Sequence, residues 1–276
     1  MTRAILPSRI LALAVLAFAS PAWSGSCAVP AMVPATMVLA AAQGAEAATV
    51  RARLEVAGAL LGEGRIAKAR EILEPLAADA ALSPADRAIA QSLLAVARSA
   101  DGEITESARI AREAVGTSRS QSSSRVRAAI ATNSALAITE AGDTRAARAA
   151  LQSAAVDAAA AGDGLLEAVA LVDLAMLESR AGGDVVAVAT RARRAIEAMP
   201  EASRRAPLYA SLGLALLPEV SGTVASPRDA LAADLLPLSD RDASAARLPR
   251  DMAVALGLSG ELRLLRGDSR AAITAL

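Results

Sequence analysis

The sequence predicts an all-α fold, an αα-superhelix in which about five to six helix-turn-helix repeats stack as a solenoid. Two observations lead to this expectation. The 276 residues are 54% hydrophobic but only 1% aromatic, and alanine dominates the apolar residues. A sheet core is rich in aromatic and β-branched side chains, whereas alanine costs least in a helix. Short glycine-containing turns also recur at nearly constant intervals along the chain.

The charge and the rare residue types exclude several classes of function. Lys plus Arg and Asp plus Glu number 29 each, so the basic excess of a typical nucleic-acid-binding protein is missing. Histidine, the commonest general base and neutral metal ligand, is absent from the sequence. The single cysteine, Cys27, cannot form a thiolate cluster or an intramolecular disulfide. We therefore expect no catalysis, no metal, no cofactor and no nucleic-acid partner.

Residues 1–24 have the layout of a secretory signal peptide. Arg3 and Arg9 precede the apolar run 10–19, and Ala22 and Ser24 are small residues at the positions that a signal peptidase reads. The apolar run is about half of the roughly 20 residues needed to cross a bilayer, which favours a cleaved signal over the alternative of a membrane anchor. We expect a periplasmic or secreted bacterial protein without stable membrane insertion after signal removal.

Residues 25–49 are predicted to be a linker, because prolines at 30 and 34 interrupt them. Cys27 follows the signal closely enough to suggest lipoprotein processing, but Ser24 stands where the lipobox pattern has an aliphatic residue. We interpret Cys27 as a thiol in the leader region rather than as a lipid anchor. Cleavage at a later point, between Ala40 and Ala48, is the alternative.

The helical-repeat domain is predicted to span 50–276. Its markers are the glycines of successive turns: Gly64, Gly102, Gly142, Gly183 and Gly267. Along the sequence the first four recur at steps of 38, 40 and 41, and the last follows after 84, which is two further steps. In the central turn, Gly142 can adopt the left-handed conformation that ends one helix, and Asp143 can cap the next.

Each unit is expected to hold two amphipathic helices, one before its glycine turn and one after it. Ser83-Pro84 and Ser226-Pro227 each place a capping serine before a proline at the first helical position. The predicted helix pairs are 50–79, 84–116, 125–161, 165–199, 203–236 and 250–276. Because the chain stops at Leu276 inside a helix, we expect the last repeat to be incomplete. Either the sequence is truncated there, or a further domain or subunit covers this end.

Several of these motifs resemble the tetratricopeptide (TPR) repeat family. The segment 209–216 reads YASLGLAL, in which Leu-Gly follows an aromatic residue by three and four positions. Ala147 is the small residue five positions after Gly142, and Pro200 stands where a repeat ends with proline. Most units lack the aromatic residue, and the spacing is nearer forty than the family's usual ~34 residues. The resemblance implies a TPR-like fold over about 50–276 and a protein or peptide partner.

In such an array the first helices of successive units line a concave side that usually meets ligands. Residues at i, i+4 and i+7 of three first helices form a recurring face, an aliphatic centre with mainly polar neighbours. This candidate partner-binding face comprises Ser92, Val96, Ser99, Thr132, Leu136, Thr139, Asp173, Leu177 and Arg180. The alternative is that the aliphatic centres pack against the neighbouring helix and the polar residues are only solvated.

The sequence thus predicts an exported TPR-like scaffold that binds a protein or peptide on its concave face. A second hypothesis makes these repeats the N-terminal regulatory region of a larger exported protein, such as a caspase-like (CHAT) peptidase, by analogy with exported bacterial arrays. A third is a small-molecule carrier with an alanine-lined cavity, which would need a closed cavity rather than an open concave surface.

Overall fold

The computed structural model describes residues 45–121, 123–217 and 226–275, and over these ranges the chain forms helices and no strand. This confirms the predicted all-α fold class. The chain divides into two compact units, with the boundary between Pro200 and Glu201. The predicted signal peptide, Cys27 and most of the predicted linker lie outside the described residues.

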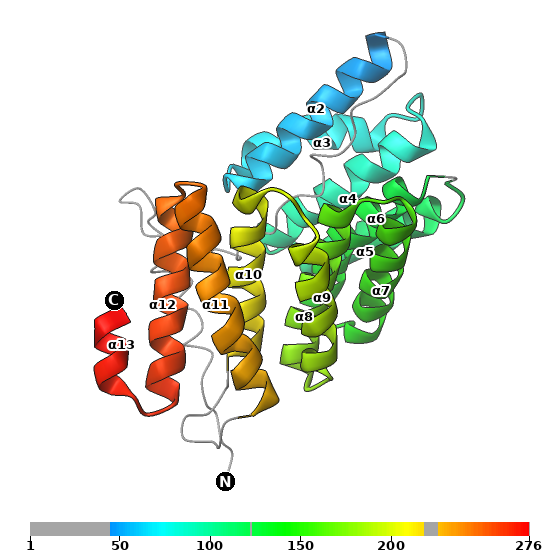
Figure 1. The fold of residues 1–276 in the computed structure, drawn as a ribbon. Helices are drawn as coiled ribbons and strands as arrows, with labels where there is room; N and C mark the ends of the chain where they lie inside the picture. Colours follow the sequence, from blue (N-terminus) through cyan, green and yellow to red (C-terminus); the bar gives the residue numbers. More distant parts are fainter. Residues whose placement is uncertain (1–44, 122, 218–225, 276) are drawn as a thin grey trace. The chain divides into compact units, whose positions relative to one another are not determined.

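The first unit consists of four consecutive helix pairs (Figure 1). Its helices are α2 (Ala45–Gly62), α3 (Ile66–Ala78), α4 (Pro84–Ala100), α5 (Ile104–Ser118), α6 (Ser124–Glu140), α7 (Thr144–Ala160), α8 (Gly164–Ala181) and α9 (Val185–Glu197). These follow the predicted pairs closely. The main difference is at the start, where α2 begins five residues before the predicted domain, inside the stretch assigned to the linker.

The four pairs stack in a row rather than around one centre. Each helix packs against the next one along the chain, and the first helices of neighbouring pairs also contact each other: α2 with α4, α4 with α6, and α6 with α8. The second helices, α3, α5, α7 and α9, meet one another at most marginally within the described residues. A row whose first helices lie closer together curves with those helices on its inside.

The turns between paired helices use the predicted chemistry. Gly142 has φ 80°, and the carboxylate of Asp143 accepts a hydrogen bond of 3.1 Å from the N–H of Ala146. In the fourth pair the residue in the left-handed conformation is Gly182, with φ 69°, and not Gly183. Gly102, Gly142 and Gly182 are therefore evenly spaced along the sequence. The one-residue offset to the predicted marker Gly183 lies in the turn after α8 and not within the helix.

Small side chains allow the first helices to pack on several sides at once. In α6 eleven of 17 residues are buried, among them Ala128, Ala131 and Ala135, and α8 is buried to a similar extent. Alanine lets helix backbones approach closely, which a helix surrounded by α4, α5, α7 and α8 requires. The predicted Ala-rich core is therefore the reason that first helices can lie side by side.

Arginine–carboxylate pairs connect successive helices of this unit. Arg127 of α6 pairs with Asp157 of α7, and Arg148 of α7 pairs with Glu178 of α8. Arg125 reaches Asp163, the N-cap of α8, at 2.8 Å. Most of these carboxylates are largely shielded from water, so the pairs hold each helix at one position against its neighbour.

The second unit contains α10 (Ala202–Leu216), α11 (Pro227–Ala245), α12 (Pro249–Leu265) and α13 (Ser269–Ala275). Tyr209 is buried in α10, and Gly213 lies where a Cβ would collide with Leu236 of α11, as the TPR-like segment 209–216 implies. The helix α11 continues through Pro237 to Ala245, nine residues beyond the predicted end, because one lost backbone hydrogen bond does not outweigh its packing against α10 and α12.

No helix of the described part of the chain is both long enough and apolar enough to cross a membrane.

Candidate functional site

The candidate site is the inner face of the first unit, formed by α4, α6 and α8. At each of these helices one aliphatic side chain stays partly exposed between buried neighbours: Val96, Leu136 and Met176. They are spaced by the same interval that separates the left-handed glycines, so they occupy equivalent places on successive helices. A repeated, partly exposed aliphatic row gives this face an apolar centre.

The structure shifts the third triplet of the predicted face by one residue. The prediction placed the marker of the fourth pair at Gly183, but Gly182 ends α8. The structural counterparts of Thr132, Leu136 and Thr139 in α8 are therefore Val172, Met176 and Ser179. The predicted residues lie one position further along, and the pattern of burial follows the corrected register.

The nine predicted residues differ in how much of each side chain a partner could reach. Ser92, Ser99, Thr132 and Leu177 are buried. Four others, Val96, Leu136, Thr139 and Asp173, are partly exposed, and Arg180 is exposed.

Three of the four predicted hydroxyl groups donate hydrogen bonds to backbone carbonyls of their own helices. Ser92 Oγ donates to the carbonyl of Ile89 at 2.8 Å, and Thr132 Oγ1 donates to that of Ala128 at 2.9 Å. Thr139 Oγ1 donates to the carbonyl of Ala135 at 2.8 Å. A partner at this face could therefore use Thr139 as an acceptor, and the buried pair could contribute only through packing.

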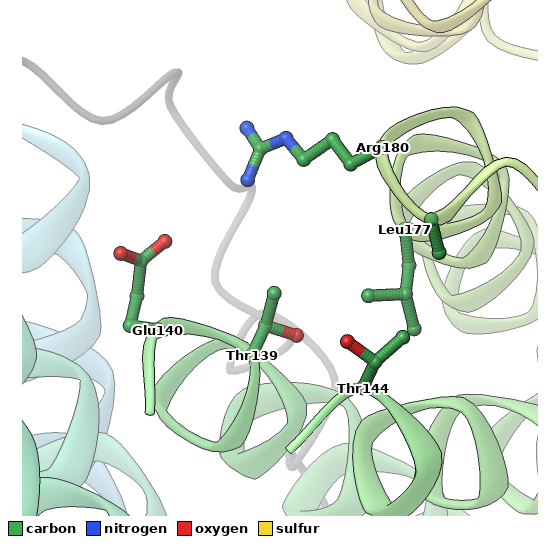
Figure 2. Close-up of a pocket in the computed structure, with 6 residues that line it drawn as sticks. Thr139, Glu140, Thr144, Leu177 and Arg180 are labelled. Atoms are coloured by element: carbon green, nitrogen blue, oxygen red, sulfur yellow. The ribbon is translucent and has the colours of Figure 1, made fainter. Parts of the chain in front are cut away.

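A hollow of about 250 Å³ opens between the end of α6 and the end of α8 (Figure 2). Its lining consists of Thr139, Glu140, Thr144, Leu177, Arg180 and Ala181. Three of these residues, Thr139, Leu177 and Arg180, belong to the predicted face. The other three were missed, although one signal was available: Glu140 precedes Arg180 by one full repeat interval.

The two charged residues of the hollow extend from opposite sides of it (Figure 2). Glu140 ends α6, and Arg180 lies in the last turn of α8. Both side chains are exposed, and neither makes an ion pair or a hydrogen bond to any side chain that the structure describes. Within the described residues, the hollow thus presents one unpaired negative charge and one unpaired positive charge, and Leu177 also lines it.

Asp173, also on α8, carries a carboxyl group with one buried oxygen atom. In the corrected register it is the counterpart of Asn133, whose Nδ2 donates to Ser92 Oγ across to α4 at 3.4 Å. The Oδ2 atom of Asp173 is buried and has no hydrogen-bond partner in the described part of the chain. Burial raises the pKa of this carboxyl group to about 7, because the charged form loses its hydration.

The described residues contain no group of three His, Cys, Asp or Glu side chains placed to hold a metal ion. Within the described residues, the inner face offers apolar contact, the unpaired charges of Glu140 and Arg180, and the carboxyl group of Asp173.

No family model matches the chain, and no curated protein matches it by sequence. Solved structures do match. The crystal structure of BtubC (BKLC) from P. vanneervenii is 15% identical, with a TM-score of 0.58, over 82% of this chain and 88% of that one.

Two crystal structures of the nearly identical TPR-like repeats of a putative kinesin light chain from Podosopora anserina are also similar. They are 17% and 18% identical to this chain, with TM-scores of 0.53 and 0.52. The matches cover 74% and 72% of this chain and 99% and 97% of the others. Identities this low concern the fold alone, and on that evidence the chain has a TPR-like helical-repeat fold.

Proposed function

We propose that this protein is an exported, non-catalytic scaffold that binds an extended segment of a partner protein across the inner face of α4, α6 and α8. The observation that carries the proposal is the row of Val96, Leu136 and Met176, which stay partly exposed at equivalent places. A row of aliphatic side chains on neighbouring first helices supports binding of a chain that crosses those helices. Binding is favoured when a partner covers partly exposed apolar side chains, because their apolar surface is removed from water.

Two features favour a peptide over a small molecule. The hollow is small, about 250 Å³, and is bordered by exposed charged residues rather than enclosed by apolar ones. Glu140 and Arg180 carry charges of opposite sign that are unpaired among the described residues, and such charges suit a polypeptide with polar groups better than a purely apolar ligand. The hypothesis of a regulatory region attached to a peptidase stays a prediction, since no observation on the described residues favours it.

The binding experiment compares two aliphatic residues, one in the row and one away from it. Random 12-residue peptides displayed on phage are selected against the purified protein, and the dissociation constants of selected peptides are measured by titration calorimetry. Leu136→Lys is expected to weaken binding at least tenfold, because it removes the centre of the apolar row. Val156→Lys changes an exposed valine of α7, 65% accessible, and is expected to alter binding less than twofold.

Circular dichroism and the melting temperature of both variants verify that each is folded. Selected peptides that bind equally well to the Leu136→Lys variant would contradict the proposed face. Failure to select any peptide would contradict peptide binding itself.

Export rests on the pattern of residues 1–24, a basic start, an apolar run and small residues before the cleavage position. Fusing residues 1–49 to alkaline phosphatase, which is active only after export, tests it in a bacterial host. We expect periplasmic phosphatase activity and a processed N-terminus. A fusion with Leu13→Arg and Leu16→Arg in the apolar run is the matched control, and equal activity from both fusions would contradict a signal peptide.

A further inference from the structure

We propose that the partner segment carries a basic and an acidic side chain about three residues apart, which bind Glu140 and Arg180 respectively as the segment crosses from α6 to α8. This inference rests on the proposed function and specifies the chemistry of its partner. It concerns the hollow between the ends of the two helices (Figure 2).

The first step of the argument is equivalence. Glu140 and Arg180 are one repeat interval apart, as are the glycines that follow them, Gly142 and Gly182. They therefore lie at the same level on neighbouring first helices, at the end of each helix. A segment that crosses the inner face at that level meets first one charge and then the other.

The second step is that these two charges are free. Elsewhere in the unit many arginines and carboxylates on facing helices are paired, as Arg148 is with Glu178 and Arg127 with Asp157. Glu140 and Arg180 face the same hollow from opposite walls, yet neither has an ion-pair partner within the described residues. Both can accept a counter-charge from a ligand without first breaking a bond in the protein.

The third step is spacing. Axes of packed helices lie about 8–10 Å apart, and a segment in the polyproline II conformation advances about 3.1 Å per residue. Because this conformation has three residues per turn, two side chains three residues apart lie on the same side and can reach neighbouring helices at one level. Leu177 also lines the hollow, and Thr139 Oγ1 keeps lone pairs that can accept a peptide N–H.

The lining of the hollow also sets the expected size of the effect. Glu140 and Arg180 are exposed, and pairs between exposed charges contribute little affinity, from a few tenths to about 1 kcal/mol each. The charges should therefore decide which peptide is preferred, by about threefold for each pair, while the apolar row supplies most of the binding. A change of preference is a sharper readout than a loss of binding.

The experiment uses four versions of one selected 12-residue peptide that differ at two positions three residues apart: Lys and Glu in both orders, Glu at both, and Lys at both. Dissociation constants are measured by fluorescence anisotropy on the purified protein. We expect the wild-type protein to prefer one of the two mixed peptides about threefold or more over both like-charged peptides. Raising the salt concentration should reduce this preference, since exposed charges are screened.

Two charge-reversal variants of the protein then change the preference in predictable directions. Glu140→Lys should prefer the peptide with two glutamates, and Arg180→Glu should prefer the peptide with two lysines. The matched controls, Glu71→Lys on α3 and Arg191→Glu on α9, reverse exposed charges on second helices and should keep the wild-type preference.

The possible failures are distinguishable. If the peptides bind through Leu136 but the reversals at 140 and 180 leave the order of preference unchanged, this inference is wrong and the proposed function stands. If no peptide depends on Leu136, the proposed function fails and this inference fails with it.

Discussion

The carboxylate of Glu178 occupies the space that a Cβ on residue 183 would need. Arg148 of α7 holds that carboxylate through both of its oxygens, with Nη2 at 2.9 Å from Oε2. Glu178 is 7% exposed, so a carboxylate that is largely shielded from water lies against the turn that follows α8. Gly183 is thus required by the ion pair and not by its own backbone conformation, since the residue with positive φ is its neighbour Gly182.

Gly183→Ala is therefore expected to destabilise the protein. Its Cβ must displace the Glu178 carboxylate and break at least one hydrogen bond to Arg148, which should lower the free energy of unfolding by about 1–3 kcal/mol. Urea denaturation followed by circular dichroism measures the change.

Gly164→Ala is the matched control for this change. Gly164 is the first residue of α8, and a Cβ there meets nothing within 4 Å, so alanine should leave stability unchanged or raise it slightly. In a Glu178→Ala background, Gly183→Ala should cost less than about 0.5 kcal/mol, because the displaced group is gone. Equal costs in both backgrounds would show that the ion pair is not the cause.

Asp173→Asn is expected to stabilise the protein at neutral and alkaline pH. Folding raises the pKa of Asp173 to about 7, above its value in the unfolded chain. The contribution of Asp173 to the free energy of unfolding is therefore fully present below about pH 4 and is lost as the pH rises through 7. Three pKa units correspond to roughly 4 kcal/mol, and partial exposure of the side chain reduces our expectation to about 2 kcal/mol at pH 8.

The measurement is urea denaturation of both proteins at several pH values between 4 and 8. The advantage of the Asp173→Asn variant should grow from near zero at pH 4 to a plateau above pH 7. Glu167→Gln, in the first turn of the same helix, is the control and should change stability by only a few tenths of a kcal/mol. An advantage that does not vary with pH would contradict burial of the charge as its cause.

Arg228→Ala is expected to weaken the second unit. The guanidinium of Arg228 donates to three carbonyls at the end of α10, those of Ala215, Leu216 and Leu217, at 2.9–3.0 Å. The last carbonyls of a helix have no partner within it and carry partial negative charge, so this cation acts as a C-cap. Its removal should cost about 2 kcal/mol, since hydrogen bonds from charged groups contribute more than neutral ones.

Hydrogen exchange locates that effect. Amides of α10 and α11 should exchange faster in Arg228→Ala, whereas those of α6 should keep their protection. Arg204→Ala removes another arginine of the same unit, whose exposed partner Glu201 lies 2.6 Å away, and should change exchange little. Similar losses from both variants would mean that capping is not the role of Arg228.

Most of the fold could be predicted because its determinants are local. Alanine-rich segments favour helices, and Gly142 with Asp143 ends one helix and caps the next through contacts within a few residues. Such signals predicted the helix pairs of the first unit to within a few residues. The predicted end of the helix pair 203–236 was wrong. Pro237 indicates a helix end locally, but α11 continues to Ala245 because it packs against α10 and α12.

The candidate site was predicted only in part, for a related reason. The sequence determined by itself that first helices recur with an aliphatic residue at Val96 and Leu136, because that pattern depends only on the repeat interval. The third place, Met176, depends on whether Gly182 or Gly183 ends α8, and both glycines can adopt positive φ. Tertiary structure decides between them, since Glu178 reaches Arg148 on another helix and fills the space beside Gly183. Glu178 is paired, whereas Glu140 and Arg180 have no ion-pair partner in the part of the chain that the structure describes. This difference follows from the same long-range packing, which no local signal encodes.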